Sequence, residues 1–300
     1  MKKLKGIIVP VILIMFLLLG LYKLDDITNY TVKLIDPMPE IVLDPPNEYA
    51  RNRSYTYVQK TDNFVPYSKQ DIMNIFYSFL DNGYKKLTFY CPSEYTDCIN
   101  EVTEVINNQT LITEIGNFVH PFNNFTDVHL TTSNSGEVNL EITKTYTQDE
   151  INTINSKIDE IFKEIFTEEI DLNDKILLAH DYLVDHSEYD TNGDDLLNAY
   201  DLFTTGKSKC FGYADAMAII LDKLEVQNYK VGSKEHVWNA VNINDEWLQI
   251  DVTWDDPIVE GNTNITSTIR HKFYMIDTET LSSYDTTEHD FNRNVYVEVK

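Results

Sequence analysis

Three residue types that together can carry nucleophilic catalysis lie in the second half of the chain: Cys210, His236 and Asp251. A thiolate can attack a carbonyl carbon, a histidine can exchange the proton, and a carboxylate can orient the imidazole. Cys210 stands where a loop becomes an apolar helix, so the positive end of the helix dipole should favour its thiolate form. A backbone N–H at the same place can bind an oxyanion. Taken alone, Cys210 also fits a buried structural thiol.

Two strands are expected to position the histidine and the carboxylate. Residues 236–243 and 246–253 flank Asn244 and Asp245, a pair suited to the positive φ angles of a two-residue hairpin turn. This register makes one face of the hairpin mainly apolar, and we take that face as the core side. The predicted cross-strand pairs are Ile243 with Glu246, Val241 with Leu248, Asn239 with Ile250, Trp238 with Asp251, Val237 with Val252, and His236 with Thr253.

The same register places His236 and Asp251 diagonally on the face opposite the core, within reach of each other. Asp251 can accept a hydrogen bond from one ring nitrogen and leave the other nitrogen for Cys210. Asp255 and Asp256 are rival carboxylates, but they lie beyond the paired residues. We therefore expect Cys210, His236 and Asp251 to be the catalytic residues.

Three short blocks around these residues carry a resemblance to a known family. The blocks are Cys210-Phe-Gly-Tyr-Ala, His236-Val-Trp-Asn and Ile250-Asp-Val-Thr-Trp-Asp-Asp-Pro257. In this order and spacing they resemble the bacterial transglutaminase-like superfamily, over roughly residues 147–275. The resemblance implies a papain-like α+β fold with the nucleophile on a helix and its partners on a sheet. It also implies a thioester, which an amine resolves in transglutaminases and water resolves in peptidases and deamidases.

The chain departs from the animal-type pattern in one respect. Those transglutaminases hold the oxyanion with a tryptophan upstream of the cysteine, whereas Trp238, Trp247 and Trp254 all lie downstream of Cys210. The second oxyanion donor is therefore unassigned. Trp238, Trp254 and Tyr213 are candidates to line the substrate groove, although packing beneath the hairpin is the default role of the two tryptophans.

The chemistry requires no metal and no organic cofactor. The stretch 190–195 looks superficially like a calcium loop, but its glycine and its missing glutamate favour a turn. His180 lies on the apolar face of a helix expected over 173–186, where a satisfied core histidine is far more common than a ligand.

The amino terminus predicts a membrane anchor. Lysines at positions 2, 3 and 5 precede an uncharged run over residues 6–22, which would span about 25 Å as a helix. The positive flank should stay in the cytoplasm, so the rest of the chain would be extracytoplasmic. We favour an uncleaved signal anchor in the cell membrane, and a cleaved signal peptide, which would give a secreted protein, is the alternative.

Composition agrees with an exported globular protein. The net charge of −25 argues against a nucleic-acid partner, because phosphates would be repelled. Cys91 and Cys98 are spaced to close a small disulfide loop, or they are two buried free thiols. The expected partners are a protein or peptide substrate, for example a cell-wall or surface protein, and the membrane through the N-terminal helix.

Turn, capping and periodicity signals divide the chain into four parts. Thr147 and Glu150 form a capping box that marks the start of the last part. The four parts are a cytoplasmic tip and signal anchor at 1–23, an extended spacer at 24–68, a small α/β domain of unknown role at 69–146, and a transglutaminase-like catalytic domain at 147–300.

Two functions of different kinds fit these features. The first is an extracytoplasmic thiol enzyme that attacks amide carbonyls, either cross-linking proteins by acyl transfer or hydrolysing amides and peptides. The second is a non-catalytic surface module for binding or assembly on the same fold. The intact set of Cys210, His236 and Asp251 favours the enzyme.

Overall fold

The computed structural model describes residues 41, 43–166, 169–191, 198–256, 270–284 and 287–299. The predicted anchor at 1–23 lies outside these ranges, as do most of the spacer up to residue 43 and most of the turn at 190–195. None of the helices within the described ranges is long and apolar enough to cross a membrane.

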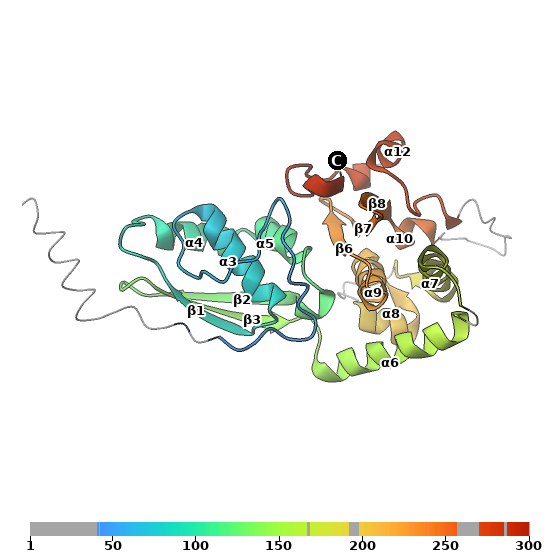
Figure 1. The fold of residues 1–300 in the computed structure, drawn as a ribbon, viewed down its shortest axis with the longest axis horizontal. Coiled ribbons are helices and arrows are strands. Elements are labelled where there is room, and N and C mark those ends of the chain that lie inside the picture. Colours follow the sequence, from blue (N-terminus) through green and yellow to red (C-terminus); the bar gives the residue numbers. More distant parts are fainter. Residues whose placement is uncertain are drawn as a thin grey trace, which may run out of the picture. The chain divides into compact units, whose positions relative to one another are not determined.

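The first half of the described chain builds an antiparallel sheet with the strand order β1-β3-β2. Its strands are β1 (Lys86–Tyr90), β2 (Phe125–Thr132) and β3 (Glu137–Lys144). The β2–β3 hairpin turns at Gly136, which has a φ angle of 88°, a conformation that glycine adopts at little cost. Helices lie beside this sheet (Figure 1). They are α3 (Lys69–Asp81), α4 (Cys98–Asn107), α5 (Gln109–Gly116) and η1 (Pro121–Asn123).

A disulfide joins this sheet to a helix. Cys91, directly after β1, is bonded to Cys98, the first residue of α4. The structure thus pairs the two cysteines that the sequence left open as bridge or free thiols. Cys210 is the remaining cysteine of the chain and is a free thiol.

The second half begins at the predicted capping box, which is present with both of its hydrogen bonds. It contains α6 (Gln148–Ile165), α7 (Leu172–His186) and α8 (Ala199–Thr205), and two short parallel strands, β4 (Glu188–Tyr189) and β5 (Lys207–Ser208). One face of α6 buries Ile151, Ile154, Ile158 and Ile161, as its period of three to four residues predicts.

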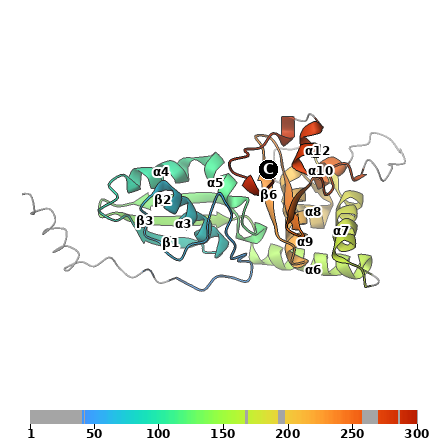
Figure 2. The ribbon, with the colours of Figure 1, turned by 45° about the horizontal axis from the view of Figure 1, so that its top comes forward.

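Helix α9 (Cys210–Lys223) packs on a second antiparallel sheet with the order β6-β7-β8 (Figure 2). Its strands are β6 (Asn228–Gly232), β7 (Val237–Ile243) and β8 (Glu246–Ile250). Apolar side chains of α9 form one core cluster with Val241 and Ile250. Helices and strands in both halves establish the predicted α+β class.

The β7–β8 hairpin has the predicted register but is shorter. Asn244 and Asp245 have φ angles of 53° and 66°, and pairing runs from Ile243 opposite Glu246 to Asn239 opposite Ile250. The three further pairs predicted towards residue 253 do not form. The reason is that the chain leaves the sheet and turns into the short helix α10 (Val252–Asp255).

The prediction of one buried face is also wrong, because both faces of this sheet are covered. Trp238, on the face away from α9, is 1% exposed. It packs against His289 and Phe291 of the C-terminal segment. That segment contains α12 (Thr278–Ser283), η2 (Thr287–His289) and η3 (Val297–Val299).

Residues 44–68 were predicted to belong to a spacer, and they instead belong to the compact unit that spans Asp44–Lys300. They form no helix or strand before Lys69, yet Tyr55, Val58 and Phe64 are buried. Arg51 reaches Asp222 of α9 at 2.6 Å. This segment therefore links elements on both sides of the predicted boundary at residue 147.

Candidate active site

Cys210 is the first residue of α9, and it is partly exposed. Gly212, two residues on, explains how the start of this helix is placed. A Cβ at Gly212 would lie 2.0 Å from Oγ of Ser208 and 2.7 Å from the carbonyl oxygen of Asn198. Only glycine allows the first turn of α9 to approach β5 and the start of α8 this closely.

His236 lies directly before β7 and Asp251 directly after β8, and both side chains are buried. Nε2 of His236 donates a hydrogen bond of 2.6 Å to Oδ2 of Asp251. Cys210 is close enough to His236 to raise the pKa of that histidine. Because Nε2 faces the carboxylate, Nδ1 is the ring nitrogen left for the sulfur. The structure therefore joins His236 to Asp251 and leaves Cys210 close enough to influence the histidine.

The Asp251 carboxylate is fixed at both oxygens. Oδ1 accepts from the backbone N–H of Trp254 at 3.2 Å, so Asp251 caps α10 while Oδ2 binds His236. The backbone N–H of Asp251 donates to the carbonyl of Phe273 at 3.0 Å. The cap accounts for two residues of the third block, because the Asp251 side chain begins the helix that contains Trp254.

The rival carboxylates have other partners. Asp255 accepts hydrogen bonds from His180 and from the backbone of Phe273. Asp256 accepts one from the hydroxyl of Tyr213. Burial raises the pKa of Asp256 to about 6. The choice of Asp251 as the partner of His236 agrees with this geometry.

His289 is a member of the site that the sequence did not reveal. Its Nε2 donates to the same Oδ2 of Asp251 over 2.8 Å, and the residue is 6% exposed. Its ring stacks on Phe273, with centroids 5.1 Å apart and planes at 13°. No motif surrounds this histidine, and only the return of the C-terminal segment over the sheet brings it to Asp251.

The histidines and the carboxylate of the site shift one another's pKa values. Burial by itself lowers the pKa of His236, but the charge and hydrogen bond of Asp251, together with the influence of Cys210, outweigh burial and raise it. Burial by itself raises the pKa of Asp251, but His236 and His289 outweigh burial and lower it. The buried pair is therefore held as imidazolium and carboxylate near neutral pH.

Two of the three predicted groove residues cannot line an open groove. Tyr213 is fully buried, and Trp238 is 1% exposed with its Nε1 donating to Oε1 of Gln249 at 2.6 Å. Trp254 is 36% exposed, and its ring centroid lies 6.4 Å from that of His236. The prediction was wrong for both buried rings. The sequence did not reveal that the C-terminal segment covers Trp238 or that the Tyr213 hydroxyl binds Asp256.

Tyr189 is a second residue that sequence reasoning missed. It ends β4 and is paired with Ser208, two residues before Cys210. Burial raises the pKa of Tyr189, and the negative charges of Cys210, Glu288 and Asp251 raise it further. The Tyr189 side chain is half-buried, so it is partly accessible to solvent.

Among the described residues, two groups of side chains could hold a metal ion. Each offers three ligand atoms that lie within 4.8 Å of one another. The first is part of what we call the thiol cluster, which consists of Cys210, His236, Asp251 and His289. The second, which we call the open cluster, consists of His180, Asp181 and His271.

Comparison with known proteins finds several similar solved structures. No protein-family model matches the chain, and no curated protein matches it. The chain is similar to a structure titled "Crystal structure of a TGase", with a TM-score of 0.34, 15% identity, and coverage of 50% of this chain and 49% of that chain. It is also similar to a putative cysteine protease from Cytophaga hutchinsonii, with a TM-score of 0.28, 15% identity, and coverage of 42% and 61%. The chain thus spans about half of the first protein and about three fifths of the second.

Proposed function

We propose that this protein is a thiol enzyme that attacks amide carbonyls and forms a thioester on Cys210. The observation that carries the proposal is the placement of His236. It is hydrogen-bonded to the buried carboxylate of Asp251, and Cys210, at the start of α9, is close enough to raise its pKa. A nucleophile, a base and a group that orients the base are therefore contiguous.

The first half-reaction follows from this arrangement. The Cys210 sulfur attacks the amide carbon, and the carbonyl oxygen takes up negative charge. His236 then gives its proton to the leaving nitrogen as the C–N bond breaks, which releases ammonia or an amine and leaves a thioester. Asp251 holds the ring in place and stabilises its charged form.

The second half-reaction reverses the roles. An amine or a water molecule attacks the thioester carbon, His236 takes its proton, and the Cys210 sulfur leaves. A primary amine gives acyl transfer and cross-linking, whereas water gives hydrolysis. Backbone N–H groups at the start of α9 are one source of oxyanion stabilisation. We assign the second donor to the hydroxyl of Tyr189, because Tyr189 pairs with Ser208, two residues before Cys210, and the charge of Cys210 raises its pKa.

The proposal includes an extracytoplasmic site of action on protein or peptide substrates. The basic and then apolar amino-terminal sequence supports export and anchoring. The disulfide between Cys91 and Cys98 supports an oxidising compartment. Surface or cell-wall proteins are the substrates that such a location would offer.

Cys210→Ala tests the proposal directly. Purified wild type and variant are incubated with surface proteins and a fluorescent primary amine, while dye incorporation and released ammonia or peptide are followed. We expect the wild type to form product and the variant to lose it, because alanine cannot form a thioester. His129→Ala, which removes an exposed histidine of β2, is the matched control and should keep full activity.

The products distinguish the possible reactions. Dye incorporation identifies acyl transfer, and ammonia or peptide without dye identifies hydrolysis. If no product depends on Cys210, and Cys210 is alkylated only slowly near neutral pH, the enzyme proposal fails and the non-catalytic surface module takes its place.

A further inference from the structure

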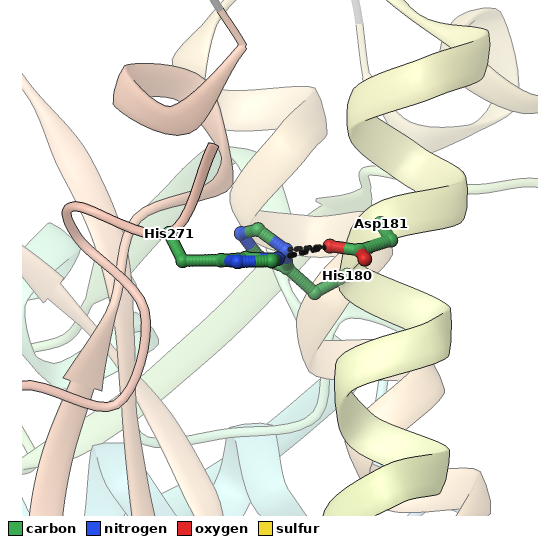
Figure 3. Close-up of side chains that lie close together, drawn as sticks. All are labelled: His180, Asp181 and His271. Atoms are coloured by element: carbon green, nitrogen blue, oxygen red, sulfur yellow. Dashed lines mark hydrogen bonds and ion pairs between the residues drawn. The ribbon is translucent and has the colours of Figure 1, made fainter. Parts of the chain in front are cut away.

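We propose that the open cluster is a binding site for a divalent transition metal ion such as Zn²⁺. Figure 3 shows its three side chains together, two from adjacent positions of α7 and one from the segment that begins at Arg270. Oδ1 of Asp181 lies 2.6 Å from Nε2 of His271 and 3.1 Å from Nδ1 of His180. Two imidazole nitrogens and one carboxylate oxygen therefore converge on one point.

The spacing is close to that of a tetrahedral zinc site. Zinc lies about 2.0–2.2 Å from histidine nitrogen and carboxylate oxygen, so two of its ligand atoms are about 3.4 Å apart. The contacts of Asp181 must open by less than about 1 Å to admit the ion. All three ligand atoms already lie within 4.8 Å of one another.

The second nitrogen of His180 provides independent support. Metal-bound histidines almost always donate their other N–H to a carboxylate, carbonyl or water, which fixes the ring and its tautomer. Nε2 of His180 donates to Oδ2 of Asp255 at 3.2 Å, and both side chains are 0% exposed. His180 therefore points Nδ1 into the cluster from a fully buried and oriented ring.

Access and charge also suit a metal ion. The side chains of His271 and Asp181 are 29% and 27% exposed, so an ion can enter from solvent and a water molecule can complete the coordination. The neighbouring guanidinium of Arg270 is paired with Asp185 at 2.9 Å. A set of two nitrogens and one oxygen favours Zn²⁺ over Ca²⁺, which prefers six or more oxygens.

A bound ion would clamp the segment from Arg270 to Tyr274 onto α7. It would replace the proton that His180 Nδ1 shares with Asp181, while the bond from Nε2 to Asp255 remains. Phe273 of this segment donates its backbone N–H to Asp255 at 2.9 Å. Metal binding would therefore stabilise the packing of this segment on α7, and this effect does not depend on the thiol chemistry.

Zinc binding to the untagged full-length protein tests the site. Cys210→Ala and His236→Asn are combined as the background, so that the thiol cluster cannot supply the ligands. Competition with a chromophoric chelator should show one Zn²⁺ per chain, and thermal unfolding should occur at a higher temperature with Zn²⁺ than with EDTA.

Variants in this background locate the ion. His271→Ala and Asp181→Asn should each raise the dissociation constant for zinc at least about tenfold and abolish the increase in unfolding temperature. His129→Ala should change neither. Asp181→Asn keeps the shape of the side chain, so it remains informative if His271→Ala does not fold.

Three outcomes overturn the site: no zinc bound, zinc binding that survives both His271→Ala and Asp181→Asn, or tighter binding of Ca²⁺ than of Zn²⁺. Enzyme activity is not a readout of this experiment. Failure of the metal site is therefore distinguishable from failure of the proposed thiol enzyme.

Discussion

The thiol cluster and the open cluster use the same arrangement in different surroundings. In each, one carboxylate oxygen accepts hydrogen bonds from two histidine rings; the acceptor is Oδ2 of Asp251 in the first and Oδ1 of Asp181 in the second. The Asp251 side chain is 2% exposed, whereas that of Asp181 is 27% exposed. Only the first arrangement lies beside a thiol. Histidine–carboxylate geometry alone therefore does not distinguish the proposed catalytic site from the proposed metal site.

A single short helix connects the two clusters. Asp251 caps the start of α10, and Asp255, the partner of His180, is its last residue. The N–H of Asp255 donates to the carbonyl of Asp251 at 3.2 Å. A shift of α10 would move the carboxylate that serves His236 and the one that serves His180 together, so the comparison is best tested by changes within each cluster.

The largest contrast is expected from the two central carboxylates. Asp251→Asn should lower kcat/KM by at least about 100-fold, because His236 loses the charge that orients it and stabilises its protonated form. Asp181→Asn should change kcat/KM by less than about threefold, because it has no contact with the thiol cluster. Steady-state kinetics of both variants, with the substrate found in the Cys210→Ala experiment, measure the difference.

Thermal unfolding of both variants is the control for folding. Equal losses of activity in two folded variants would break the comparison. They would mean that the open cluster, acting through α10, contributes to catalysis as much as Asp251 does.

A smaller contrast is expected from one tyrosine beside each cluster. Tyr189→Phe should lower kcat by about 10- to 100-fold with little change in KM, because it removes a hydrogen-bond donor used mainly in the transition state. Tyr274→Phe is the matched control, since the Tyr274 ring lies 4.9 Å from that of His180 in the open cluster. It should leave kcat unchanged. If Tyr189→Phe raises KM and leaves kcat unchanged, Tyr189 binds substrate and is not an oxyanion donor.

Local patterns in the sequence predict many of the helices and strands that position the thiol cluster. The Asn244-Asp245 turn sets the β7–β8 register, and the capping box sets the start of α6. Both depend on neighbouring residues, so a single sequence contains the necessary information. The apolar helix after Cys210 follows from the same kind of local pattern.

Features that depend on distant contacts were not predicted. The strand expected through residue 253 ends at Ile250, and the next backbone N–H, that of Asp251, donates to the distant carbonyl of Phe273. His289 reaches Asp251 across a sequence separation of 38 residues, and no local pattern signals this return. His180 has the expected apolar face, but its carboxylate partner Asp255 lies 75 residues away. Tertiary packing decides all three features.

The smallest expected effect concerns the dependence of stability on pH. Folding raises the pKa of His236 above its ordinary value of about 6.5 because Asp251 and Cys210 outweigh burial. The stability from this histidine is therefore fully present below about pH 6.5 and is lost as pH rises through the folded-state pKa. Asp251 has the opposite sign, and its contribution is lost as pH falls below about 4.

Thermal unfolding of wild type and His236→Asn at a series of pH values checks this assignment. The difference in Tm between them should be several degrees at about pH 6 and should shrink steadily above about pH 7, because each unit of pKa shift corresponds to about 1.4 kcal/mol. His271→Asn, the partly exposed counterpart in the open cluster, should give a smaller difference from wild type at about pH 6. A wild-type advantage over His236→Asn that grows towards alkaline pH would show that His236 is held neutral, and the imidazolium proposed as the proton donor to the leaving nitrogen would then be wrong.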